Sequence, residues 1–156
     1  MLPLREEHSA TLVSPSCVGS ASGSQWLDDF MGQLSEDEKP DYLGLHFYTA
    51  ADKPSDAEVV AARGYFTSRH TTHNRPVIIT ELASTSRNAT EVEDFNKAVG
   101  GWLDAQSWIF EYRFFGVSRQ PADGFVSPAA QLLDGSGQWT ALGRWFVGAE
   151  DAQLFN

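Results

Sequence analysis

The sequence lacks several features that particular classes of protein need. Cys17 is the only cysteine, so an internal disulfide and a cysteine-based zinc site are excluded. Basic residues are few, with 11 Lys and Arg against 21 Asp and Glu, and the net charge is −10 at pH 7. Phosphate binding calls for basic patches, so no nucleic-acid partner is expected. No apolar run approaches the length of a membrane span, so no transmembrane segment is expected.

Targeting and cofactor signals are also scarce. Residues 1–8 have no apolar signal-peptide core, which predicts a cytoplasmic protein if this N-terminus is complete. Residues 19–24, "GSASGS", lie where a phosphate loop would, but they lack its glycine spacing and its lysine. His70 and His73 have no acidic partner nearby in the sequence. We therefore expect no cofactor and no metal.

What is present suits one globular domain over residues 1–156, with 42% hydrophobic residues. Short apolar runs alternate with amphipathic stretches. Strands are expected at 11–15, 42–48, 76–81 and 108–115. Helices are expected after Ser24, after capping boxes at 55–58 and 90–93, and over 140–147.

These elements form four strand–helix units, which predicts a parallel sheet with right-handed crossovers. Two α/β architectures fit: a small doubly wound sheet, or half of an eight-stranded (β/α) barrel. A full barrel takes about 250 residues. Four units alone would leave two open sheet edges, which natural proteins avoid.

In both architectures functional groups gather at the carboxyl ends of the strands. One acid, one imidazole, hydroxyl groups and aromatic rings are expected there, and this mixture suits a sugar. Hydroxyls of a sugar need hydrogen bonds, and its C–H faces pack on rings. The candidate residues are Ser16, His46, Tyr48, Glu81, Tyr112 and Phe114.

Structural interpretations of the same residues compete with the functional ones. Glu81 could be a surface carboxylate that begins a loop, or the partner of a helix cap. His46, flanked by Leu45 and Phe47, could be a hydrogen-bonded core histidine. Phe114 could simply fill the interior of a barrel.

The order of four motifs resembles the Asl1-like glycosyl hydrolases, the catalytic-core proteins of glycoside hydrolase family 128, found largely in fungi. The motifs are "LVSPS", "YLGLHFY", "RPVIITELAS" and "QLLDGSGQWTALGRWF", with an aromatic "Y-x-F-F" strand at residues 112–115 between the last two. The resemblance implies a (β/α)8 TIM barrel of the glycosidase type that acts on β-1,3-glucan. It maps this chain onto strands 5–8 and their helices, which form the C-terminal half of the barrel.

The resemblance also implies roles for individual residues. Glu81 matches the nucleophile of a retaining mechanism, and Tyr48, more than His46, is expected to contact it. No carboxylate of this chain matches the family's acid/base, so that residue is expected to be missing from the chain. The fourth strand reads Glu111-Tyr112-Arg113 where members commonly read like Arg-Tyr-Ala.

We therefore expect a glycoside hydrolase, with β-glucan as its partner, that is inactive as this chain alone. The family resemblance implies a secreted or cell-wall location. One alternative is a non-catalytic glucan-binding protein on the same fold. A more remote alternative is a small flavodoxin-like domain.

Overall fold

The computed structural model describes residues 5, 7–120 and 124–149. Strands and helices alternate along the chain, and a short C-terminal part follows the last strand. The elements are β1 (Cys17–Val18), α2 (Ala21–Gly32), β2 (Leu43–Tyr48), α3 (Ser55–His73), β3 (Val77–Ala83), α4 (Ala89–Asp104), β4 (Ile109–Phe114), the 3-10 helix η1 (Pro128–Ala130) and α5 (Ala141–Phe146).

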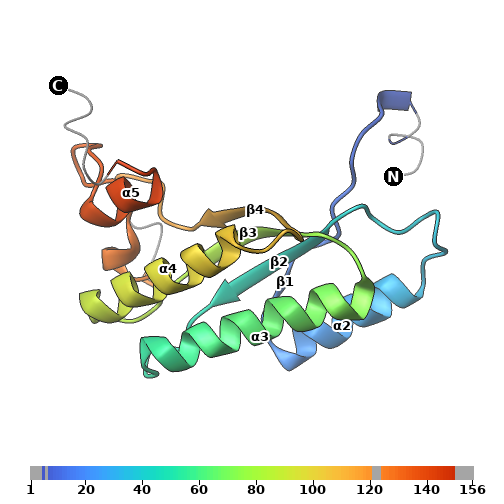
Figure 1. Ribbon diagram of the computed structural model, residues 1–156, viewed down its shortest axis with the longest axis horizontal. Helices are drawn as coiled ribbons and strands as arrows, with labels where there is room; N and C mark the ends of the chain where they lie inside the picture. The colour runs from blue at the N-terminus through green and yellow to red at the C-terminus, as the bar shows by residue number, and fades with distance from the viewer. Residues whose placement is uncertain (1–4, 6, 121–123, 150–156) are drawn as a thin grey trace.

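The strands form one parallel sheet in the order β1-β2-β3-β4. Helices α2, α3 and α4 all lie on the same face of this sheet (Figure 1). A doubly wound sheet carries helices on both faces, whereas a barrel wall carries them on the outside only. The arrangement therefore favours the partial barrel over the doubly wound and flavodoxin-like alternatives.

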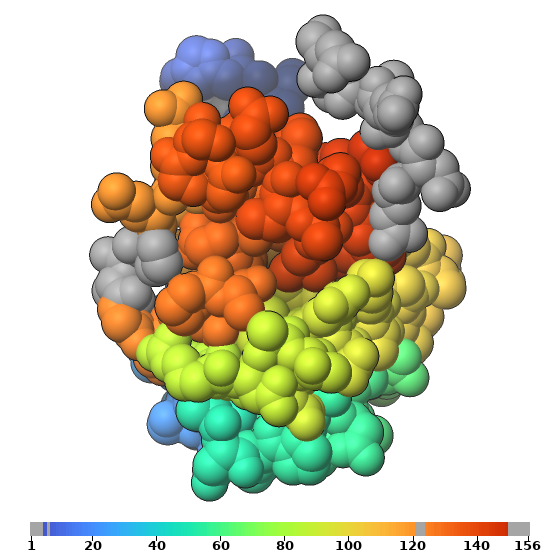
Figure 2. All heavy atoms as spheres, turned by 90° about the vertical axis from the view of Figure 1, so that its left-hand side faces the viewer, coloured from blue at the N-terminus to red at the C-terminus, as the bar shows by residue number. Residues whose placement is uncertain are grey.

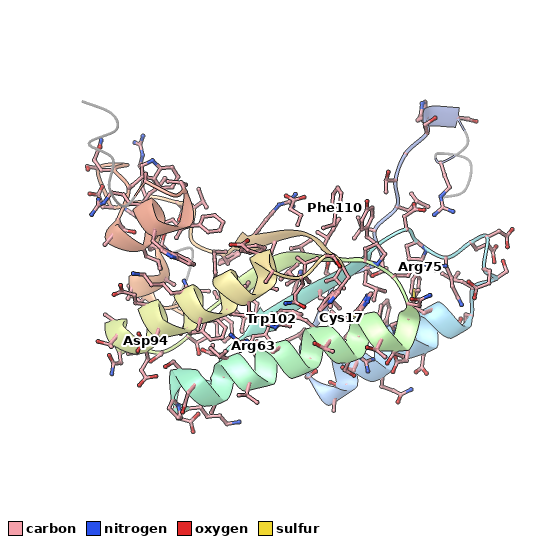
Figure 3. The ribbon with its side chains drawn as sticks, viewed as in Figure 1. Cys17, Arg63, Arg75, Asp94, Trp102 and Phe110 are labelled. Carbon is pink, nitrogen blue, oxygen red and sulfur yellow. The ribbon has the colours of Figure 1, made fainter. Side chains whose placement is uncertain are left out.

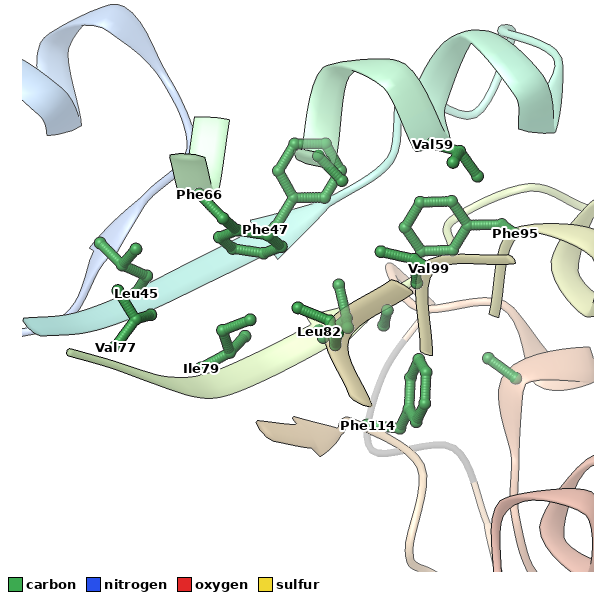
Figure 4. Packing of buried hydrophobic residues seen from close by; sticks show 14 of the residues in the cluster. Leu45, Phe47, Val59, Phe66, Val77, Ile79, Leu82, Phe95, Val99 and Phe114 are labelled. Atoms are coloured by element: carbon green, nitrogen blue, oxygen red, sulfur yellow. The ribbon is translucent and has the colours of Figure 1, made fainter. Parts of the chain in front are cut away.

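The hydrophobic core fills the space between the sheet and this helix layer (Figure 4). The strands contribute apolar side chains from alternate positions, and the helices contribute theirs at helical spacing. Phe47 packs on Phe66 and Phe95, with ring centroids 5.9 and 6.3 Å away. Fully buried members include Leu43, Leu45, Phe66, Val77, Ile79, Leu82, Val92 and Val99.

The first strand differs from the prediction of a strand over residues 11–15. Only Val13 forms an isolated bridge there, to Tyr42, and β1 begins at Cys17. Pro15 has no N–H to give to the ladder. The Ser14 N–H donates to the Tyr42 carbonyl at 2.9 Å, and its side-chain Oγ accepts from the Gly44 N–H at 2.9 Å.

The helix starts also differ from the predictions. Helix α2 begins at Ala21, where Ser20 Oγ accepts from the Gly23 N–H at 3.0 Å, so Ser24 is not the cap. The two predicted capping boxes are wrong. Helix α3 follows Pro54 without a side-chain cap, and Asn88 Oδ1 caps α4 by accepting from the Thr90 N–H.

The carboxylates of those predicted boxes hold a loop instead. Glu58 is buried and accepts from the Ala50 N–H at 3.1 Å. Glu91 accepts from the Ser55 N–H. The loop between β2 and α3 is thus fixed at both ends by side chains of the helix layer.

The C-terminal part covers the ends of the strands. The predicted last helix is confirmed as α5, with Thr140 as its N-cap. Trp145 of α5 packs against α4 at Gly100, where an added Cβ would lie 2.7 Å from the indole ring. Viewed from the side to which the strand arrowheads point, this part lies over α4 (Figure 2). Among the described helices, none has the length and apolarity needed to cross a bilayer.

Candidate active site

An irregularity in β3 places the central carboxylate. His46 of β2 is in register with Glu81, while the preceding residue of β2 is in register with Ile79, so Thr80 is the extra residue of a β-bulge. Strict alternation would put Glu81 on the same face as Ile79, which is fully buried against the helices. The bulge turns Glu81 to the opposite face and returns Leu82 to the core.

Two side chains of β2 contact Glu81 on this open face. The Tyr48 hydroxyl donates a hydrogen bond to Glu81 Oε2. His46 Nδ1 lies 3.4 Å from the same oxygen. The Glu81 side chain keeps 35% of its surface exposed. The carboxylate is therefore oriented by a phenol and an imidazole and remains accessible to a ligand.

Ser16 lies near this group but makes a different contact. Its Oγ is 2.9 Å from Thr80 Oγ1, so it braces the bulge next to Glu81. Gly44 leaves room for this arrangement, because a Cβ there would lie 2.4 Å from Ser16 Oγ and 2.7 Å from the Ser14 carbonyl oxygen.

Buried hydroxyls fix the two loops that leave the site. Thr49 Oγ1 accepts from the Thr85 N–H at 2.9 Å, and Thr85 Oγ1 donates to the Thr49 carbonyl at 2.7 Å. Ser84 Oγ is 3.3 Å from Thr49 Oγ1. All three residues are buried. The residues that follow Tyr48 and Glu81 are thereby tied to each other.

The structure corrects the expected position of Tyr112 and Phe114. They share a face of β4, but it is the helix-covered face. Phe114 is buried beside Trp145 and Phe146, so it is a core residue. The Tyr112 hydroxyl donates to Asp104 at 2.8 Å. Burial, with help from this hydrogen bond, raises the pKa of Tyr112.

Other polar residues noted in the sequence analysis make contacts with nearby residues and do not join the group around Glu81. On β4, Arg113 Nη2 lies 2.7 Å from Glu111 Oε1, so the two added charges of this strand pair with each other. His70 Nδ1 is 2.8 Å from the Arg75 carbonyl oxygen, and its ring stacks on Trp108. Within the described residues, no cluster of three or more His, Cys, Asp or Glu is arranged to hold a metal ion.

Two aromatic residues near Glu81 were not predicted from the sequence. The Tyr48 ring packs on Phe115 and Phe125, with centroids 6.3 and 5.1 Å away. Phe115 directly follows β4, and Phe125 lies in the loop after it. The Phe114-Phe115 pair was visible in the sequence, but only the structure shows that the second ring faces the site.

A family model, described as the glycosyl hydrolase catalytic core, matches residues 1–146. The chain belongs to the glycosyl hydrolase catalytic-core family. Its parallel sheet and alternating helices agree with the TIM-barrel type of the solved structures that it resembles. No curated protein sequence matches the chain.

Solved structures of glycoside hydrolase family 128 superpose on this family member. A subgroup VI exo-β-1,3-glucanase from Aureobasidium namibiae shares 39% identity at a TM-score of 0.81, over 93% of this chain and 56% of that one. A subgroup V exo-β-1,3-glucanase from Cryptococcus neoformans shares 29% identity at 0.76, over 96% and 59%. A subgroup II endo-β-1,3-glucanase from Sorangium cellulosum shares 26% at 0.76, over the same fractions. The chain thus spans between half and two thirds of these structures.

Proposed function

We propose that this chain acts in the hydrolysis of β-1,3-glucan, with Glu81 as the nucleophile of a retaining mechanism. One observation carries the proposal. The carboxylate stands at the carboxyl end of a barrel strand, turned out of the core by a bulge and oriented by Tyr48 and His46. The named glucanases of the family support the choice of substrate.

In the first step, a Glu81 oxygen forms a bond to the anomeric carbon while the bond from that carbon to the glycosidic oxygen breaks. The leaving oxygen takes a proton from a second carboxyl group. Water then attacks the anomeric carbon, gives its proton to that same group and releases Glu81. Tyr48 holds the attacking carboxylate in one orientation, which lowers the cost of reaching the bond-forming geometry.

The second carboxyl group is the acid/base. Of the residues that the structure describes, Tyr48 and His46 contact the Glu81 carboxylate, and no other carboxylate does. We place the acid/base in the portion of the family fold that this chain does not span. The chain on its own is therefore expected to show no significant hydrolysis of laminarin, and a secreted or cell-wall setting fits the substrate.

The nucleophile can be tested without the acid/base. A 2,4-dinitrophenyl 2-deoxy-2-fluoro-β-laminaribioside loses its phenolate without protonation, and the fluorine slows release of the sugar from the enzyme. We expect one glycosyl adduct per chain, mapped to Glu81 by peptide mass spectrometry. Glu81→Gln should form none, and Glu111→Gln, a control on the neighbouring strand, should react as the parent does. An adduct on another carboxylate would contradict the assignment of Glu81.

A second candidate is a non-catalytic glucan-binding protein. This candidate is favoured because, among the described residues that contact one another at the site, Glu81 is the single carboxylate and its partners are Tyr48 and His46. Binding of laminaritriose that survives Glu81→Gln, together with no adduct in the parent chain, would select this candidate.

A further inference from the structure

The loop after β4 exposes a large apolar side chain, Phe125, beside the proposed site. Phe125 keeps 55% of its surface exposed, although the next two residues, Val126 and Ser127, are buried. The Ser127 N–H donates to the Ser84 carbonyl at 3.0 Å. The exposed ring is thus attached to a loop segment that is anchored to the end of β3.

Arg87 holds the backbone on both sides of Phe125. Its guanidinium donates to the Gly124 carbonyl and, at 3.1 Å, to the Val126 carbonyl. Two donors in a rigid planar fork fix a backbone segment better than a single flexible ammonium could. Arg87 itself lies in the loop between β3 and α4, directly before Asn88, the N-cap of α4.

The ring so presented lies next to Tyr48, which contacts Glu81. The centroids of Phe125 and Tyr48 are 5.1 Å apart, and the Tyr48 hydroxyl donates to Glu81. Phe125, Phe115 and the Tyr48 ring form an aromatic group beside the polar atoms of Glu81 and His46. Apolar surface next to a few convergent polar groups is typical of ligand sites. Phe125 offers an apolar surface within one side chain of the carboxylate.

We propose that Phe125 stacks on the C–H face of a glucosyl unit bound at this site, and that Arg87 is the positioning residue that holds Phe125 there. The proposal rests on the proposed function and adds to it the aromatic contact that recognises the sugar. Ring stacking is tolerant of the details of a sugar, so this contact contributes affinity, while Glu81 supplies the chemistry.

The first test measures laminaritriose binding to the full chain by NMR titration. Phe125→Ala should weaken binding about fivefold, the size expected of one ring contact, and Phe125→Trp should restore it. Phe110→Ala is the matched control, because Phe110 is 64% exposed and points away from the helices on β4 (Figure 3). Its contact is Tyr42 at the opposite end of β2. Unchanged affinity in Phe125→Ala, or an equal loss in Phe110→Ala, would overturn the proposal.

Arg87 is tested by coupling to Phe125. Arg87→Gln should weaken laminaritriose binding as Phe125→Ala does, yet add nothing in the Phe125→Ala background. If Arg87 had a purely structural role, Arg87→Gln would lower laminaritriose affinity by the same factor in the parent chain and in the Phe125→Ala chain. That result would overturn the positioning role. Arg144→Gln is the control, because Arg144 also donates to a backbone carbonyl, that of Trp139 at 2.8 Å.

Adduct formation at Glu81 separates the two proposals. With saturating fluorosugar, Phe125→Ala should still form the adduct, since the ring binds and Glu81 reacts. An adduct in the parent chain with unchanged affinity in Phe125→Ala refutes the Phe125 proposal alone. If the parent chain forms no adduct and binds no laminaritriose, both the proposed function and the Phe125 proposal are refuted.

Discussion

The two faces of the same sheet have opposite characters. On the face toward α3 and α4, Leu45, Phe47 and Ile79 are buried in a closely packed core. On the other face, Tyr48 and Glu81 are partly exposed, and the Tyr48 hydroxyl donates a hydrogen bond to Glu81. Strands β2 and β3 thus place core side chains and site side chains on opposite faces, and each of these two strands contributes to both.

This division explains why the site can be rigid although it is open. On the open face, the Tyr48 ring packs on Phe115 and Phe125. The strands that carry Tyr48 and Glu81 are also supported from behind by the core, and hydroxyl groups such as those of Thr49 and Thr85 tie the strand ends together. Substitutions on the two faces should therefore separate stability from ligand chemistry.

The largest expected effect is on the helix-covered face. Phe66→Ala removes a fully buried ring in contact with Phe47, and we expect the free energy of unfolding to fall by about 3–5 kcal/mol. Urea unfolding followed by circular dichroism measures it. Val60→Ala, on the exposed side of the same helix, should change the value by less than about 0.5 kcal/mol. Similar losses in both variants would mean that this face is not a packed core.

The next largest expected effect concerns the close packing of Ser14 and Ser16 against Gly44 of β2. An Ala at position 44 would meet Ser16 Oγ and the Ser14 carbonyl, so Gly44→Ala should lower the free energy of unfolding by about 2 kcal/mol. Gly64→Ala is the control, because a Cβ there meets nothing within 4 Å and lies inside α3. It should stabilise the protein by about 0.5–1 kcal/mol. Stabilisation by both substitutions would show that the segment of Ser14 and Ser16 does not pack against Gly44.

The third effect is on chemistry rather than stability. Tyr48→Phe keeps the ring contacts with Phe115 and Phe125 but removes the hydroxyl that donates to Glu81. We expect the rate of adduct formation from the fluorosugar to fall about tenfold, with little change in urea unfolding. An unchanged rate would show that this hydrogen bond does not orient the Glu81 carboxylate for the reaction.

The smallest expected effect is on stability, from the substitution of Tyr112. Tyr112→Phe removes a hydrogen bond to Asp104 on the helix-covered face and should cost about 1 kcal/mol or less in unfolding. The rate of adduct formation and the affinity for laminaritriose should stay as in the parent chain. A loss of sugar affinity here would restore the sequence-based assignment of Tyr112 to the site.

Much of the fold could be predicted from the sequence. The apolar runs of β2, β3 and β4 and the helical faces around Phe66 and Phe95 show clear periodicity, because burial selects apolar side chains at regular spacing. Caps were harder to predict: Glu58 lies at the box position but accepts from the Ala50 N–H of the preceding loop, and Glu93, at the second box position, pairs with Lys97. A capping box depends on which distant backbone donor competes for the carboxylate, and local sequence carries no signal for that.

The sequence by itself determined the strand–helix alternation, the single carboxylate after "VIIT" and the family to which these motifs belong. The tertiary structure alone decided which face each side chain occupies. A bulge at Thr80 turns Glu81 out of the core, and packing against α5 draws Tyr112 and Phe114 into it. The physical reason is that side chains alternate with a period of two along a strand. One extra residue in a ladder therefore exchanges the faces of every residue after it, and only pairing with the neighbouring strand fixes where that residue lies.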